Sequence, residues 1–181
     1  GHPDYKVVCF EPDSGLAEVA RSNLEMNSID NEIYNHGLGE KEEELPFIFG
    51  SIENTGVGKF DRNMGSSKKL PVKRMDDCIS EEFEVDLIKI DVEGFELDVL
   101  LGAENTIKSN EPVLIINHVD YDHYLRCKDV ICEFGYIPVE VFCATPTFVY
   151  VKQSADIHHA QANTATWVDC WTDFTQTHPN Q

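Results

Sequence analysis

Short runs of apolar, β-branched residues alternate along this chain with segments whose apolar residues recur every three or four positions. The runs predict strands, because each is too short for a helix and is bounded by residues that break regular structure. The periodic segments predict helices that bury one stripe. Strand runs lie at 5–10, 85–92 and 113–116, and the helical segments that follow them lie at 16–24, 97–107 and 124–134. This order predicts an α/β fold with a mostly parallel sheet.

The C-terminal third of the chain departs from this alternation. Residues 136–142 and 147–151 read as two strands with a short turn between them, which predicts an antiparallel hairpin at the sheet edge.

Residues 40–75 are acidic and then rich in glycine and serine, so we expect an irregular insertion or flap of loops and short strands. We therefore divide the chain into a domain over 1–153 and a tail over 154–181 that packs on it.

The charge balance excludes two classes of partner. The 181 residues include 14 Lys and Arg against 33 Asp and Glu, so the net charge is −19. An acidic surface repels both a nucleic-acid backbone and an anionic membrane face. We therefore expect a protein that binds neither nucleic acid nor membrane. The length of 181 residues predicts one compact domain.

The cysteines indicate a reducing compartment. Six are present, and no two are separated by the two-residue gap of a zinc knuckle or a redox motif. A domain of this length builds a sufficient core without disulfides. We therefore expect free thiols and a cytoplasmic protein.

Polar side chains stand where the predicted strands end. Glu11 follows the first strand, Asp91 and Glu93 close the strand at 85–92, and His118 follows the strand at 113–116. Ligands of open α/β sheets bind at the carboxyl ends of the strands. Glu11 is placed to accept hydrogen bonds from ribose hydroxyls, or it simply ends the strand. His118 is able to take a proton near neutral pH, or it is a structural histidine.

The same region leaves two further interpretations open. Lys89 inside an apolar strand needs a partner, and an ion pair with Asp91 would serve only to fix the strand. Asp91 with Asn117, His118 or Asp120 would alternatively form an oxygen-rich site of the kind that Mg²⁺ accepts. The main interpretation includes no metal.

Four blocks of the sequence resemble the FkbM family of methyltransferases over about residues 7–151. They are VVCFEPDSGLAEVARSNLEMN from position 7, HGLGEKE from 36, LIKIDVEGFELDVLLGAENTI from 87 and PVLIIN from 112. The resemblance implies a Rossmann-like, class I fold and S-adenosylmethionine as the cofactor. It also implies methylation of a hydroxyl on a sugar or small metabolite.

The resemblance further implies roles for individual residues. Glu11 would bind the ribose hydroxyls, Pro12 and Asp13 would border the adenine pocket, Gly37 and Leu38 would cover the adenine, and Asp91 would lie beside the methionine end. Glu93 would lie near the transferred methyl group. His118 and Glu93 are the candidate proton acceptors for the attacking hydroxyl.

Two departures from the family pattern keep alternatives open. Asn117 and His118 stand where the family commonly has a glutamate. The family's first strand and glycine-rich loop would precede Tyr5, so we expect this chain to be a fragment of a longer protein. A swapped segment or the chain's own C-terminus would also complete the sheet, and the former implies a homo-oligomer. A cation-assisted O-methyltransferase and an inactive binding or scaffold module are the functional alternatives.

Overall fold

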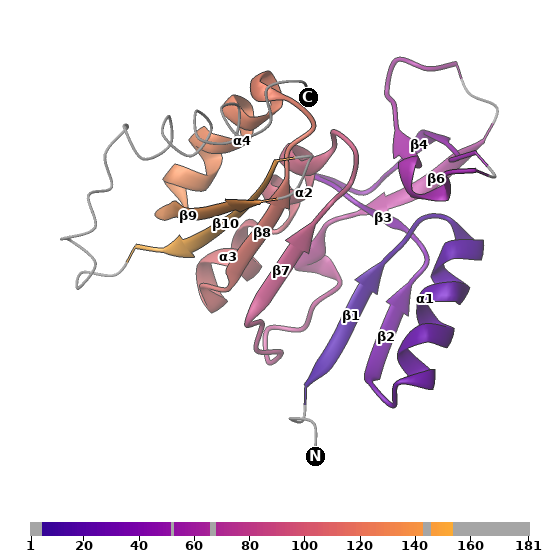
Figure 1. Cartoon of the computed structure of the whole chain (residues 1–181), viewed down its shortest axis with the longest axis horizontal. Coiled ribbons are helices and arrows are strands. Elements are labelled where there is room, and N and C mark those ends of the chain that lie inside the picture. Colours follow the sequence, from indigo (N-terminus) through magenta and orange to yellow (C-terminus); the bar gives the residue numbers. More distant parts are fainter. Residues whose placement is uncertain (1–4, 52, 66–67, 143–145, 154–181) are drawn as a thin grey trace.

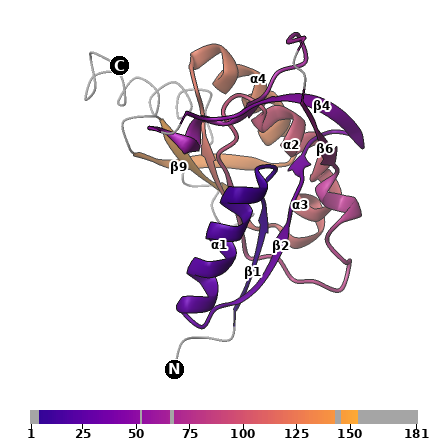
Figure 2. The same cartoon turned by 90° about the vertical axis from the view of Figure 1, so that its right-hand side faces the viewer.

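A parallel two-stranded sheet and one helix open the fold. The computed structural model describes residues 5–51, 53–65, 68–142 and 146–153. Strands β1 (Lys6–Phe10) and β2 (Asp30–Tyr34) pair in parallel, and α1 (Ser14–Met26) connects them and lies alongside (Figures 1 and 2). Asp13 caps α1, because its carboxylate accepts the backbone N–H of Gly15 at 2.7 Å. The strand–helix unit predicted at the N-terminus is therefore present.

A second sheet holds most of the core. Its order is β7-β8-β10-β9, with β7 parallel to β8 and the remaining pairs antiparallel (Figure 1). The strands are β7 (Leu87–Ile90), β8 (Val113–Asn117), β10 (Thr147–Lys152) and β9 (Tyr136–Phe142), and the helices are α2 (Glu96–Gly102), α3 (Glu104–Asn110) and α4 (Tyr121–Glu133). Ile88 and Ile90 are buried whereas Leu87 and Lys89 are exposed, so the helices cover one face of β7. The predicted C-terminal hairpin is present as β9 and β10.

A third, smaller sheet occupies the region expected as an insertion. Its order is β3-β6-β4-β5. The elements are β3 (Gly37–Leu38), β4 (Glu43–Ile48), η1 (Thr55–Val57), β5 (Lys59–Phe60), β6 (Lys69–Lys73) and η2 (Met75–Asp77). Only β3 and β6 pair in parallel, and β4 pairs antiparallel with both its neighbours. Residues 40–75 thus contribute short strands to a sheet of their own.

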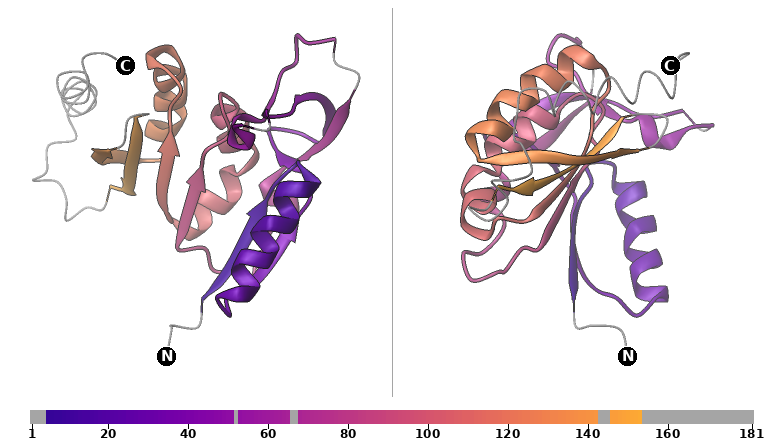
Figure 3. Two further views of the ribbon diagram at one scale, coloured as in Figure 1. Left: turned by 45° about the vertical axis from the view of Figure 1, so that its right-hand side comes forward. Right: turned by 60° about the vertical axis from the view of Figure 1, so that its left-hand side comes forward.

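The sheets are mixed rather than mostly parallel. Strands β1 and β7 run side by side in the same direction (Figures 1 and 3), yet the described residues of the two strands form no backbone ladder. The described strands are therefore divided into separate sheets at this position. The C-terminal hairpin and the strands of residues 40–75 add the antiparallel pairs. The observed fold is α/β with mixed sheets.

The helix predicted over 97–107 is divided at Ala103 by a distant carboxylate. Asp76 accepts the backbone N–H groups of Asn105 and Thr106 and also the Thr106 hydroxyl, at 2.9 to 3.1 Å. These amides belong to the first turn of α3, where a helix has no internal acceptors. Capping from η2 therefore starts a new helix where the apolar periodicity alone predicts a continuous one.

The tail at 154–181, predicted to pack on the domain, lies outside the described residues. Among the residues that are described, no helix has the length and apolar character needed to cross a bilayer.

The end of α2 packs directly on the backbone near β3. A Cβ atom at Gly102 would lie 1.9 Å from the carbonyl oxygen of Gly39. The contact is with backbone, so no side-chain rotation relieves it. Only glycine permits this approach of α2 to the β3–β4 connection.

We expect Gly102→Ala to lower the free energy of unfolding by at least about 2 kcal/mol, because backbone must move to admit the methyl group. Urea denaturation followed by circular dichroism measures the change. Gly65→Ala is the matched control, since a Cβ there meets nothing within 4 Å, and its effect should stay within about 0.5 kcal/mol. Equal effects of the two substitutions would contradict the packing described.

Candidate functional site

A cavity of about 1150 Å³ lies between β1 and β7. Residues 5–10 form one wall and residues 85–92 form the other. The cavity slightly exceeds the usual range of about 300–1,000 Å³ for ligand pockets. It occupies the position at which the predicted sheet is divided. The carboxyl ends of two parallel strands therefore border one hollow.

Glu11 closes the β1 side of the cavity. It is half-buried, and its Oε1 accepts the backbone N–H of Asp13 at 2.7 Å. Burial raises the pKa of the Glu11 carboxyl above its ordinary value of 4.5. Pro12 and Asp13 line the same cavity, although the Asp13 carboxylate is engaged as the α1 cap. Glu11 and Asp13 thus both border the cavity, and the Asp13 carboxylate also stabilises the start of α1.

Strand β3 lines the cavity with buried backbone. Gly37 and Leu38 are both buried and both border the hollow. A Cβ at Gly37 would lie 2.3 Å from Cε2 of Phe60, so the ring lies directly against the backbone. Phe47 and Phe95 extend this aromatic wall, with ring centroids 5.0 and 5.6 Å from that of Phe60. Sequence reasoning missed these rings, because pairing of residues far apart in the sequence brings them to the cavity.

Asp91 closes the β7 side and pairs with Lys89. The Asp91 Oδ2 lies 2.8 Å from Lys89 Nζ, so the ion pair considered from the sequence is present. Both side chains are well exposed, at 59% for Lys89 and 38% for Asp91. Solvent therefore screens the pair, and it adds little to stability. The Asp91 carboxylate stays accessible from the cavity that it lines.

The loop after Asp91 leaves strand geometry. Glu93 has a φ of +53° and Gly94 a φ of +99°. The alternation of side chains along β7 therefore ends before Glu93, which is half-buried and does not line the cavity. Gly94 is favoured here because side-chain-bearing residues rarely adopt its φ.

A buried carboxylate that the sequence analysis overlooked holds this loop in place. Glu96 is fully buried, and its Oε1 accepts the backbone N–H groups of Val92 at 3.3 Å and Gly94 at 3.2 Å. From α4, His123 Nε2 donates to the Gly94 carbonyl at 3.1 Å. The Glu96 Oε2 lies 3.2 Å from the same Nε2, but without hydrogen-bond alignment. Helices α2 and α4 therefore fix the turn that carries Asp91 and Glu93.

His118 lies in the core, away from the cavity. It is fully buried, its Nε2 forms a 2.7 Å hydrogen bond with the Tyr150 hydroxyl, and it is absent from the cavity lining. Burial lowers the pKa of His118 to about 3, so the ring is neutral at physiological pH. Asp120 caps α4 by accepting the His123 N–H at 2.8 Å.

The predicted site residues thus fall into two groups. The cavity is lined by Glu11, Pro12, Asp13, Gly37, Leu38 and Asp91, whereas Glu93 and His118 are not among its lining residues. Of the residues considered for the alternative Mg²⁺ site, Asp91 also pairs with Lys89 and Asp120 also caps α4.

Glu96→Ala should lower the free energy of unfolding by about 2–4 kcal/mol, because it leaves two loop amides without acceptors and opens a cavity beside His123. Thermal and urea unfolding measure the change. Glu104→Ala removes an exposed carboxylate paired with Lys108 and should cost no more than about 0.5 kcal/mol. A small and equal effect of both substitutions would show that Glu96 does not hold the loop.

The chain is similar to known proteins in sequence and in fold. Residues 3–149 match the sequence model of the methyltransferase FkbM domain family. No curated protein sequence matches the chain. Among solved structures, the chain is similar to methyltransferase FkbM from Methylobacillus flagellatus KT, with a TM-score of 0.57 and 19% identity. The match covers 81% of this chain and 36% of that one, so the chain spans about a third of the length of that protein.

Proposed function

Because the chain belongs to the FkbM methyltransferase family, we propose that it transfers a methyl group from S-adenosylmethionine to a hydroxyl oxygen of a sugar or small metabolite. The observation that carries this proposal is the meeting of two carboxylates at one cavity. Glu11 from the end of β1 and Asp91 from the end of β7 both line it. Carboxylates at the ends of parallel strands suit a ligand that has hydroxyl groups and positive charge.

The cavity residues fit the cofactor class. The Glu11 carboxylate would accept hydrogen bonds from the two ribose hydroxyls, while its Oε1 is kept in place by the Asp13 amide. The backbone of Gly37 and Leu38, backed by the Phe60 ring, would cover the adenine. The exposed Asp91 carboxylate would offset the positive charge of the sulfonium group. The ribose, adenine and sulfonium groups of the cofactor would therefore meet complementary chemistry.

The protein's contribution to the reaction is alignment and proton removal. The cofactor, when bound, supplies an electrophilic methyl group. The two strand ends and the β3 backbone would hold the donor side, so the acceptor hydroxyl would meet an already oriented methyl group. The attacking hydroxyl must also lose its proton.

Glu93 is the better candidate for accepting that proton. It does not line the cavity itself, but it lies two residues after Asp91, which does, and it is only half-buried on the loop that Glu96 fixes. His118 is enclosed in the core and hydrogen-bonded to Tyr150. We therefore propose Glu93 as the proton acceptor, with His118 outside the catalytic group.

Glu11→Gln and Asp91→Asn should weaken cofactor binding in different ways. The loss of Glu11 should weaken the binding of S-adenosylmethionine and of its product S-adenosylhomocysteine equally, by about 10-fold or more. The sulfur of S-adenosylhomocysteine carries no charge. The loss of Asp91 should weaken the binding of S-adenosylmethionine about 3- to 10-fold more than that of S-adenosylhomocysteine, because only S-adenosylmethionine carries the sulfonium charge. Isothermal titration calorimetry gives both affinities, with Glu18→Gln on the exposed face of α1 as control. Identical patterns for Glu11→Gln and Asp91→Asn would refute the division of roles.

The pH dependence of binding provides an independent check on Glu11. Its pKa is raised above 4.5 by burial, and the ionised form is the better acceptor for hydroxyl donors. Affinity should therefore fall as pH decreases through a midpoint above 4.5. In Glu11→Gln this acidic limb should vanish, and its persistence would assign the titration to another group.

Glu93→Gln should lower turnover about 100-fold or more while changing S-adenosylhomocysteine affinity less than about twofold, because the amide accepts no proton. Incorporation of labelled methyl groups into a panel of monosaccharides measures turnover. Asp122→Asn, at an acid in the first turn of α4, is the control. Unchanged turnover in Glu93→Gln would exclude it as the proton acceptor.

A further inference from the structure

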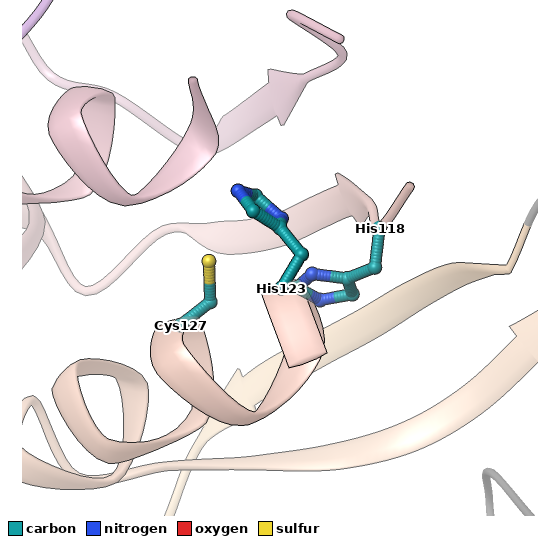
Figure 4. A group of neighbouring side chains, drawn as sticks. All are labelled: His118, His123 and Cys127. Atoms are coloured by element: carbon teal, nitrogen blue, oxygen red, sulfur yellow. The ribbon is translucent and has the colours of Figure 1, made fainter. Parts of the chain in front are cut away.

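Three buried side chains with metal-binding chemistry converge at the end of β8. His118 follows β8, and His123 and Cys127 lie one helical turn apart on α4 (Figure 4). One potential ligand atom from each residue lies within 4.8 Å of the others. The residues are 0%, 3% and 0% exposed, respectively. Among the described residues this is the one group of three or more histidine, cysteine or acidic side chains so arranged.

Both imidazoles have one nitrogen without a hydrogen-bond partner. The Nδ1 atoms of His118 and His123 are buried and form no hydrogen bond with the protein. A buried polar atom left in this state costs about 1–3 kcal/mol. Two such atoms next to a buried thiol indicate a ligand shared among the three side chains.

The opposite nitrogens of the two rings are already engaged. His118 Nε2 bonds the Tyr150 hydroxyl at 2.7 Å, and His123 Nε2 donates to the Gly94 carbonyl at 3.1 Å. Glu96 Oε2 lies 3.2 Å from that same nitrogen. Metal-bound histidines are commonly oriented by a carbonyl or carboxylate on the nitrogen that faces away from the metal, as His123 is here by the Gly94 carbonyl. The free nitrogens are therefore the Nδ1 atoms.

We propose that His118, His123 and Cys127 bind a zinc ion through the two Nδ1 atoms and the Cys127 sulfur. Imidazole and thiolate ligands select zinc over Mg²⁺ and Ca²⁺, which take oxygen ligands. As the zinc–sulfur bond forms, the thiol proton passes to solvent and both imidazoles bind in their neutral form. Tetrahedral coordination requires ligand atoms about 3.3–3.7 Å apart, so zinc would draw the three atoms together slightly. A water molecule completes the usual four ligands.

Catalytic zinc sites usually have three protein ligands and a water, but the position of this site indicates that the ion would connect elements of the fold. None of the three residues lines the cavity between β1 and β7. Zinc there would join α4 to the end of β8 and, through His123 and Gly94, to the loop that bears Asp91 and Glu93. The proposal does not depend on methyl transfer, because its readouts are metal content and stability.

Cobalt substitution tests the sulfur ligand directly. Protein stripped with a chelator and titrated with Co²⁺ should bind one equivalent and show a sulfur-to-cobalt charge-transfer band with visible bands of tetrahedral cobalt. Zinc should displace the cobalt. Cys127→Ser should lose the charge-transfer band and weaken binding about 100-fold or more. Cys132→Ser, which changes an exposed thiol on the same helix, should bind as the unsubstituted protein does.

Two further measurements keep the test decisive. Cys78→Ser tests a second thiol–imidazole pair, because Cys78 Sγ lies 3.8 Å from His36 Nε2. This variant should keep the cobalt charge-transfer band. Zinc should raise the melting temperature of the unsubstituted protein and of Cys132→Ser but not that of Cys127→Ser. If Cys127→Ser does not fold, Cys127→Ala replaces it. Absence of the cobalt band in the unsubstituted protein, or its retention in Cys127→Ser, would overturn the proposal and leave a buried water as the bridge between the imidazoles.

Discussion

One buried carboxylate, that of Glu96, determines the geometry on which the candidate site depends. A carboxylate with no exposure to solvent is costly unless hydrogen bonds compensate it, and Glu96 obtains them from the backbone of the loop after β7. The loop is consequently held in a conformation that includes two consecutive positive φ angles, at Glu93 and Gly94. His123 holds the same loop from the other side through the Gly94 carbonyl. Two helices thereby set the position of Asp91 opposite Glu11.

Local sequence patterns predicted most strands and helices but not the contacts between distant segments. The apolar runs at β1, β7 and β8 and the C-terminal hairpin follow from residue type and spacing alone. The division between α2 and α3 does not, because it depends on Asp76 reaching Asn105 and Thr106 from another part of the chain. The antiparallel pairing of β4 with β6 likewise depends on contacts between distant segments. Interactions of this kind leave no periodic signal in the sequence.

The same distinction explains which site residues were foreseen. Strand ends that share an edge bring their terminal side chains together, so Glu11 and Asp91 were predictable from topology and both line the cavity. The environment of His118 is set by Tyr124, Phe148 and Tyr150, which surround its ring. No pattern near position 118 predicts these neighbours or the proximity of Cys127. Glu96 was overlooked because an acid in the first turn of a helix usually faces solvent.

The proposed cofactor site requires that a single ligand contact both strand ends at once. Backbone amide spectra of the isotopically labelled protein, recorded with increasing S-adenosylhomocysteine, test this directly. The account predicts saturable shifts at residues 11–13 after β1 and at residues 91–92 after β7, with the same dissociation constant at both places. Shifts confined to one of these segments, or to surfaces away from the cavity, would contradict it.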